Sequence, residues 1–184
     1  MGNRGLLHDD TACIVRPWRL KAWITCRLSY KGWSRKPLMK PGRYTELFFL
    51  DEATALSAGH RPCAMCRRQD YLTFKSLWLA TKGFEPGMNA AELDGRLHVE
   101  RTHRGTGNDW RQPLTALPAG VLVMWHAAPC LWDGAVLRPW SSMGYGHALA
   151  PRDPSTADLL TPPSIVNTIR QGYAVQIHPG ASNP

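Results

Sequence analysis

Cys63 and Cys66 form the most informative chemical pattern in the sequence. They lie in the run Gly59-His60-Arg61-Pro62-Cys63-Ala64-Met65-Cys66-Arg67-Arg68. Two thiolates separated by two residues can bind one metal ion without strain. A redox pair would follow a strand of a βαβ unit, and the sequence shows no such unit. We therefore predict a zinc site, with two unrelated core cysteines as the alternative.

A zinc ion needs a third and usually a fourth protein ligand. Cys26 is the first candidate and His98 the second, and His103 is a further one. Cys13 and Cys130 are weaker candidates. His60 lies so close to Cys63 in sequence that we expect it to pack locally instead of binding the metal.

The positive charge of the chain is concentrated near its beginning. Residues 1–44 hold ten basic and two acidic side chains, which accounts for the whole net charge of +8. Aromatic residues are interleaved with these cations, at Trp18, Trp23, Tyr30 and Trp33. Cations can contact phosphates and rings can stack on bases, so the region suits nucleic acid. The alternative is a solvated basic surface. The expected phosphate contacts come from Arg16, Arg19, Lys21, Arg27 and Arg35.

The fold class that we predict is α+β, with a small cysteine-based zinc module, two helices, a short-stranded antiparallel β region and a C-terminal helix. Asp51 is a good N-cap for a helix over residues 52–58, and Gly59 suits the position after its end. A second helix is predicted over residues 64–80, and residues 44–50 read as a buried strand.

The second half of the chain has a different pattern of residues. Short apolar runs interrupted by Pro and Gly predict antiparallel strands over residues 121–125, 130–132 and 135–137, with a hairpin turn at Asp133-Gly134. Thr161 is predicted to cap a last helix. We expect a first region over residues 1–80 and a β-rich region over residues 81–184, packed together as one unit.

The run Phe48-Phe49-Leu50-Asp51-Glu52-Ala53-Thr54-Ala55-Leu56-Ser57-Ala58-Gly59, with the cysteine motif that follows it, resembles the zinc module of the Ada family of DNA alkylation-repair proteins. That module has a Phe-Phe strand, an Ala-rich helix and a Cys-x-x-Cys-Arg motif. The resemblance covers about residues 23–68 and implies Cys26, Cys63 and Cys66 as zinc ligands, contact with DNA phosphates, and a role in DNA repair or modification. Tyr30 stands where the family has its fourth cysteine, and Arg68 where it usually has proline, which implies a replaced ligand or an open metal position.

A second constellation suggests an alternative function. His98-Val99-Glu100 has the His-x-Glu form that zinc nucleobase deaminases combine with Pro-Cys-x-x-Cys, although their order in this chain is reversed. In that interpretation Glu100 is the catalytic proton shuttle for a zinc-bound water in a hydrolase or deaminase. The alternative without catalytic chemistry places His98 and Glu100 on one face of an exposed strand, in weak surface ion pairs.

Several other classes of protein are disfavoured. No apolar run approaches the roughly 20 residues of a membrane span. Residues 1–10 have no secretory apolar core, so we expect a cytoplasmic protein without a membrane partner. The sequence contains no P-loop, no dinucleotide fingerprint and no Gly-x-Ser-x-Gly.

Overall fold

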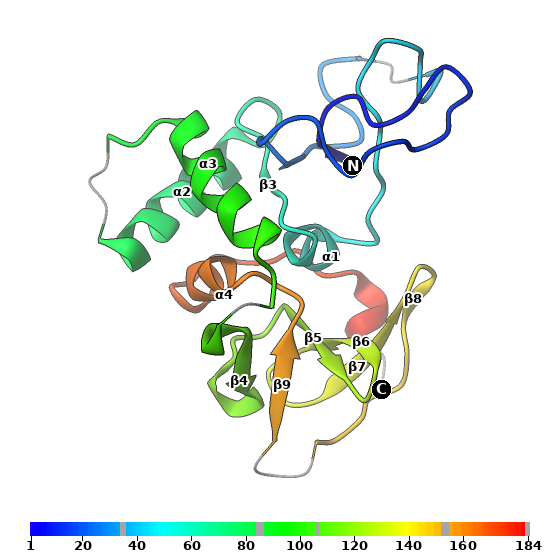
Figure 1. Ribbon diagram of the computed structural model, residues 1–184. Coiled ribbons are helices and arrows are strands. Elements are labelled where there is room, and N and C mark those ends of the chain that lie inside the picture. The colour runs from blue at the N-terminus through cyan, green and yellow to red at the C-terminus, as the bar shows by residue number, and fades with distance from the viewer. Residues whose placement is uncertain (34–35, 84–86, 106, 152–154, 183–184) are drawn as a thin grey trace.

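A loop-rich N-terminal region, fastened by a small sheet, lies at one end of the molecule (Figure 1). The computed structural model describes residues 1–33, 36–83, 87–105, 107–151 and 155–182. The small sheet consists of β1 (Gly2–Asn3), β2 (Ile24–Thr25) and β3 (Arg61–Pro62). β1 runs antiparallel to β2, whereas β2 and β3 are parallel. The predicted strand over residues 44–50 is wrong, because that segment makes only an isolated bridge between Leu47 and Gly2.

The first two helices flank the cysteine motif. α1 (Glu52–Ser57) begins after Asp51, whose carboxylate accepts the backbone N–H of Thr54 at 2.8 Å, so the predicted N-cap is confirmed. Gly59 follows α1 with a φ of +80°, a left-handed conformation that glycine adopts without strain. α2 (Arg68–Lys82) begins four residues later than expected, because residues 64–67 form turns.

A third helix, α3 (Ala90–Thr102), corrects the predicted order of elements. The expected sequence of two helices followed directly by a β region omitted it. Asn89 and Glu92 form a capping box at its start, with the Asn89 side chain accepting backbone N–H groups and Glu92 accepting the N–H of Asn89. Leu93 and Leu97 are buried, so this helix has a core face.

The second half contains a six-stranded sheet in the order β4-β9-β5-β6-β7-β8, in which every neighbouring pair is antiparallel. Asp133 holds the turn between β6 and β7 by accepting two backbone N–H groups, which confirms the predicted hairpin. The strands are β4 (Arg111–Pro113), β5 (Val121–Trp125), β6 (Ala128–Trp132), β7 (Leu137–Ser141), β8 (Gly144–Tyr145) and β9 (Thr156–Leu159).

The last helix is α4 (Pro163–Arg170). Its N-cap is Pro162 and not Thr161, because the Thr161 hydroxyl instead accepts the backbone N–H of Leu122 on β5. Short 3-10 turns cover Asn108–Trp110, Leu114–Ala116 and Pro179–Ser182.

One large apolar core joins most of these elements. It includes Leu56 of α1, Phe74 of α2, Leu93 of α3, Val121 of β5 and Ile165 of α4. The core therefore receives side chains from both predicted regions, on either side of residue 80. α1 and α4 lie between the N-terminal region and the six-stranded sheet (Figure 1). None of the helices described has the length and apolar character that crossing a bilayer requires.

Candidate metal centre

The pairing of β2 with β3 places two cysteines side by side. Thr25 pairs with Pro62 in this parallel ladder. The residues that directly follow them in the chain are Cys26 and Cys63. The backbone N–H of Cys63 donates to the Thr25 carbonyl at 2.9 Å, which fixes the two segments at this level. Ligands from distant parts of the sequence are thus brought together by backbone register.

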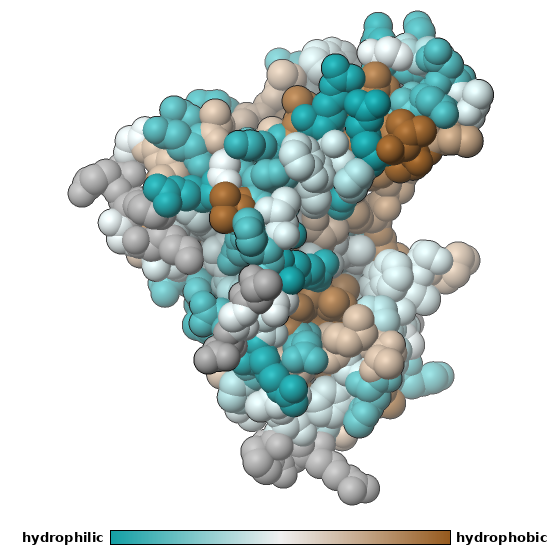
Figure 2. Space-filling view, in the orientation of Figure 1, coloured by the Kyte–Doolittle hydropathy of each residue, from teal (hydrophilic) through white to brown (hydrophobic). Residues whose placement is uncertain are grey.

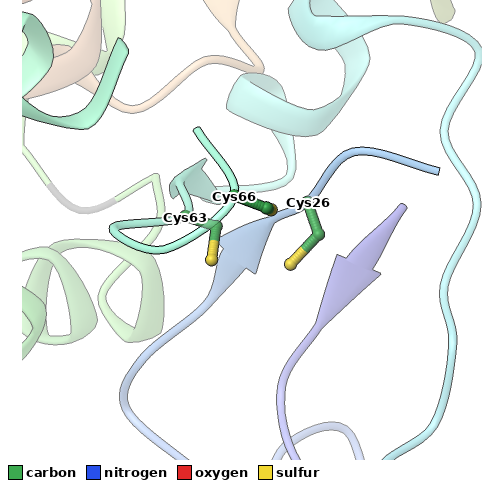
Figure 3. A group of neighbouring side chains, drawn as sticks. All are labelled: Cys26, Cys63 and Cys66. Carbon is green, nitrogen blue, oxygen red and sulfur yellow. The ribbon is translucent and has the colours of Figure 1, made fainter. Parts of the chain in front are cut away.

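Cys66 completes the group through a tight turn. The Arg67 N–H donates to the carbonyl of Cys63 at 3.0 Å, which closes the turn and returns Cys66 toward the first two thiols (Figure 3). The sulfur atoms of Cys26, Cys63 and Cys66 all lie within 4.8 Å of one another. Cys63 and Cys66 are buried and Cys26 is half-buried.

Hydrogen bonds favour a thiolate in this group. The pKa of Cys63 is lowered to about 5 by a hydrogen bond from Cys26 and, against the opposing effect of burial, by the backbone N–H groups of Cys66 and Met65. The same sulfur–sulfur contact, together with burial, raises the pKa of Cys26. The backbone N–H of Arg27 also donates to the sulfur of Cys66 at 3.3 Å. The thiolate is the form of cysteine that binds metal ions.

The three thiols fit the needs of a metal ion. Sulfurs bound to one tetrahedral ion at about 2.3 Å lie about 3.8 Å apart, so sulfurs already within 4.8 Å need only small movements. Among the residues that the structure describes, no further His, Cys, Asp or Glu joins the group. The ring of Tyr30 packs against that of Trp33, with the ring centroids 5.9 Å apart.

A cavity of about 390 Å³ adjoins the group on the side of Cys26. Its acidic residues are engaged by other parts of the protein. The Glu52 carboxylate accepts a hydrogen bond from the Tyr173 hydroxyl and forms an ion pair with Arg67, and Asp70 accepts a hydrogen bond from Nε of Arg67. The cavity is lined by Met1, Thr25, Cys26, Arg27, Leu28, Phe49, Asp51, Glu52, Arg67, Asp70 and Gln176.

His98 does not join the thiol group. It lies on α3, where its ring packs edge-on against Trp18 at 4.3 Å and lies 6.1 Å from Trp23. The sequence predicts His98 as a ligand from its residue type and from the His-x-Glu pattern, and neither of these fixes its position in space. The exposed strand that was considered for these two residues is wrong, because they belong to a helix.

Glu100 has a structural partner instead. Residues two apart on a helix point in nearly opposite directions, so His98 and Glu100 do not share a face of α3. The Glu100 carboxylate accepts the backbone N–H of Ser164 at 2.8 Å and also its hydroxyl. It therefore satisfies the first turn of α4, and the described residues do not form the arrangement of glutamate beside metal that a deaminase needs.

The residues predicted to contact nucleic acid are mostly at the surface. Arg16, Arg19, Lys21 and Arg27 are exposed, whereas Arg35 lies outside the described residues. Figure 2 shows hydrophilic and hydrophobic side chains next to each other over this N-terminal region. The large apolar side chains exposed there are Ile14, Val15, Trp18, Leu20, Leu28, Trp33, Leu38 and Phe48.

Sequence reasoning missed the residues that fasten the cysteine motif to the rest of the molecule. Arg67 directly follows Cys66, and its guanidinium contacts the buried Glu52 carboxylate at 2.6 Å. Glu52 in turn accepts the Tyr173 hydroxyl at 2.8 Å and the backbone N–H of Gln176 at 3.0 Å. Glu52 lies in the first turn of α1, and nothing local in the sequence indicates a partner at residue 173.

No family model, curated protein or solved structure matches the chain. The assignment of a role therefore depends on the geometry of the residues themselves.

Proposed function

We propose that the protein is a zinc protein that engages nucleic acid, with DNA the expected partner, through its basic N-terminal region. The observation that carries the proposal is the position of Arg27. Its backbone N–H donates to the sulfur of Cys66, and its side chain is exposed, as are most of the other described cations of residues 1–44. The thiol group and the basic surface are therefore built on the same segment.

The chemistry of that surface suits a polyanion. Exposed guanidinium and ammonium groups can replace the counterions of a phosphate backbone. Trp18 and Trp33 are 38% and 58% exposed, which leaves ring faces and edges available for stacking on bases. A surface that served only solubility would not need such apolar exposure beside its cations.

Zinc is the metal that we propose for the three thiols. Thiolate ligands favour zinc and other soft or borderline metals over magnesium and calcium, which prefer oxygen. Bound zinc would hold residue 26 and residues 63–66 together, and would thereby stabilise the attachment of the basic N-terminal region to the cysteine motif. The ion is proposed to be structural in this role, and a contribution to DNA repair or modification is an extension supported only by the Ada-like motif.

The test is binding of labelled single-stranded and duplex DNA as a function of salt. For each phosphate that the protein contacts, the slope of log K against log salt is expected to be about −0.9 on duplex DNA. Replacement of Arg16 or Arg19 by Gln is expected to weaken binding to all sequences and to reduce the slope by about one contact. Arg111→Gln is the matched control, because Arg111 is an exposed arginine on β4 of the other sheet.

Two results would contradict the proposal. One is binding that is undetectable at low salt or that does not change as salt rises. The other is an equal loss of affinity in Arg16→Gln and Arg111→Gln, since the N-terminal region would then have no special role. Elemental analysis of the purified protein tests the metal separately, with one zinc per chain expected.

A further inference from the structure

Two arginines from distant parts of the chain meet over one buried tryptophan. The guanidinium carbon of Arg4 lies 3.8 Å from the centroid of the Trp23 ring, and that of Arg101 lies 4.6 Å from it. Trp23 is only 8% exposed. Arg101 comes from the last turn of α3 and Arg4 from the segment after β1, so the fold concentrates two positive charges at this point.

No carboxylate neutralises these two arginines among the ion pairs of the described residues. Asp94, the carboxylate that acts most strongly on Arg101, is engaged by both arms of the Arg61 guanidinium at 2.8 and 2.6 Å. Burial lowers the pKa of Arg4 and of Arg101 to about 10, so both stay protonated at neutral pH. Both guanidinium groups are half-buried, and their hydrogen bonds go to uncharged acceptors: Leu97 O and Lys21 O for Arg101, and His60 Nε2 and Ala58 O for Arg4. Two neighbouring positive charges that no described carboxylate pairs with favour the binding of an anion at this place.

Three of the residues around the Trp23 ring each carry a buried polar atom without a hydrogen-bond partner. The atoms are Nη2 of Arg101, Nδ1 of His98 and Nδ1 of His60. Leaving such an atom unpaired is unfavourable, and buried groups of this kind in folded proteins usually have a partner. Nη2 of Arg101 can only donate, and Nδ1 of His98 can carry the ring proton, so the missing partner is a hydrogen-bond acceptor.

The basic region docks onto α3 at this place. The Lys21 carbonyl accepts Nη1 of Arg101 at 3.1 Å, and the Arg4 carbonyl accepts the N–H groups of Arg19 and Leu20 at 3.0 and 2.9 Å. Trp18, which is partly exposed, packs edge-on against the ring of His98. Arg4 and Arg101 therefore both contact the backbone of residues 19–21, a segment that also carries exposed cations.

We infer that the junction between residues 18–21 and α3 binds a phosphate group. Arg101 supplies the guanidinium that faces the phosphate, His98 supplies a second donor, and Arg4 and Lys21 supply positive charge. A guanidinium fork matches the oxygens of a phosphate better than an ammonium group does. In the form where the phosphate belongs to a nucleic acid backbone, this inference rests on the function proposed above and adds α3 to the contact surface.

The experiment uses the full-length, metal-loaded protein and two probes. The first probe is inorganic phosphate, compared with chloride at the same ionic strength, and the readouts are tryptophan fluorescence and the melting temperature. The second probe is a labelled oligothymidylate. The variants are Arg101→Gln, Arg101→Lys and the control Arg111→Gln. Because each variant is compared with itself with and without phosphate, a lower basal stability does not disturb the comparison.

Phosphate is expected to raise the melting temperature of the wild type and of Arg111→Gln, and to have no specific effect on Arg101→Gln. Arg101→Gln is expected to bind oligothymidylate about tenfold more weakly, which is the typical effect of a lost charged hydrogen bond. Arg101→Lys keeps the charge without the fork and is expected to lie between the two.

The outcomes separate this inference from the proposed function. If Arg101→Gln responds to both probes as the wild type does, the phosphate site is overturned. If Arg101 is needed for the phosphate response but not for the oligonucleotide, the site holds a free phosphate group. If the wild type binds no oligonucleotide at any salt but still shows an Arg101-dependent phosphate response, the proposed function fails and the phosphate site stands.

Discussion

Cys26 directly follows Thr25 of β2, and Cys63 directly follows Pro62 of β3, the residue that pairs with Thr25. Parallel strands advance in the same direction, so the residues after a pair leave the sheet on the same side and at the same level. The distance between these thiols is thus set by backbone hydrogen bonds. A substitution of either thiol is expected to change metal binding without removing the ladder that positions them.

Cys26→Ser is expected to weaken zinc binding by more than about 100-fold. Changes to residues that only contact a ligand already cost 10–100-fold, and the loss of a thiolate ligand removes more. The measurement is competition against a chromophoric zinc chelator. Cys13→Ser is the matched control, because Cys13 is exposed and lies outside the thiol group. Unchanged affinity in Cys26→Ser would show that Cys26 is not a ligand.

The coordination of the bound ion is a second prediction. The described residues offer three sulfurs, and Tyr30 packs on Trp33 instead of approaching them. Zinc-edge X-ray absorption is therefore expected to show three sulfur neighbours at about 2.3 Å and one light atom, nitrogen or oxygen, at about 2.0–2.1 Å. A shell of four sulfurs would contradict this prediction and would require another cysteine, Cys13 or Cys130, to move into the site.

Local motifs predicted the parts of this molecule that are local. The Cys63–Cys66 spacing, the Asp51 cap and the Asp133-Gly134 turn each involve residues a few positions apart, and their short-range geometry follows from the residue types. Cys26 is a candidate by residue type, and the Ada-like resemblance favours it as a ligand. Its sequence spacing gives no such signal, because its approach to Cys63 depends on strand pairing over a long sequence separation.

The errors arose where one pattern fits two structures. His98-Val99-Glu100 would place both side chains on one face of a strand, but on α3 it directs them apart. The signal that could have decided the matter is the Asn89-x-x-Glu92 capping box, which marks the start of a helix. The contact of Arg4 and Arg101 with the same Trp23 ring could not be predicted, since the sequence around each arginine gives no indication of the other.

The Glu100 carboxylate supports a third prediction. Glu100→Gln keeps the shape of the side chain but weakens acceptance of the Ser164 N–H and hydroxyl at the start of α4. We expect a loss of about 1–2 kcal/mol in the free energy of unfolding, as for the loss of a helix cap, with zinc content unchanged. Urea denaturation and elemental analysis measure the two quantities.

Asp158→Asn is a suitable control for Glu100→Gln, because the Asp158 side chain is 65% exposed and its ion pair with Arg111 is long, at 3.9 Å. Loss of zinc in Glu100→Gln would contradict the prediction, since Glu100 would then act as a ligand. Unchanged stability would show that the contact with Ser164 contributes little to the first turn of α4.

His60 supports a prediction about pH. It is fully buried, and burial together with the nearby charges of Arg4 and Arg101 holds its pKa well below the ordinary value of 6.5. In the unfolded chain this histidine takes up a proton as the pH falls below about 6.5, whereas in the native state it resists protonation. The unfolded state then binds more protons, so the stability that neutral His60 allows is present above pH 6.5 and is lost as the pH falls.

His60→Gln is expected to remove this contribution, which amounts to at most about 1.4 kcal/mol per pH unit below pH 6.5. Glutamine can still accept the hydrogen bond that Arg4 Nε donates to Nε2 of His60 at 3.2 Å. The measurement is the free energy of urea unfolding between pH 7.5 and pH 5, compared as slopes so that a lower stability at neutral pH does not matter. His147→Gln is the matched control because His147 is exposed. Equal slopes in the wild type and in His60→Gln would show that His60 does not carry the acid sensitivity of the fold.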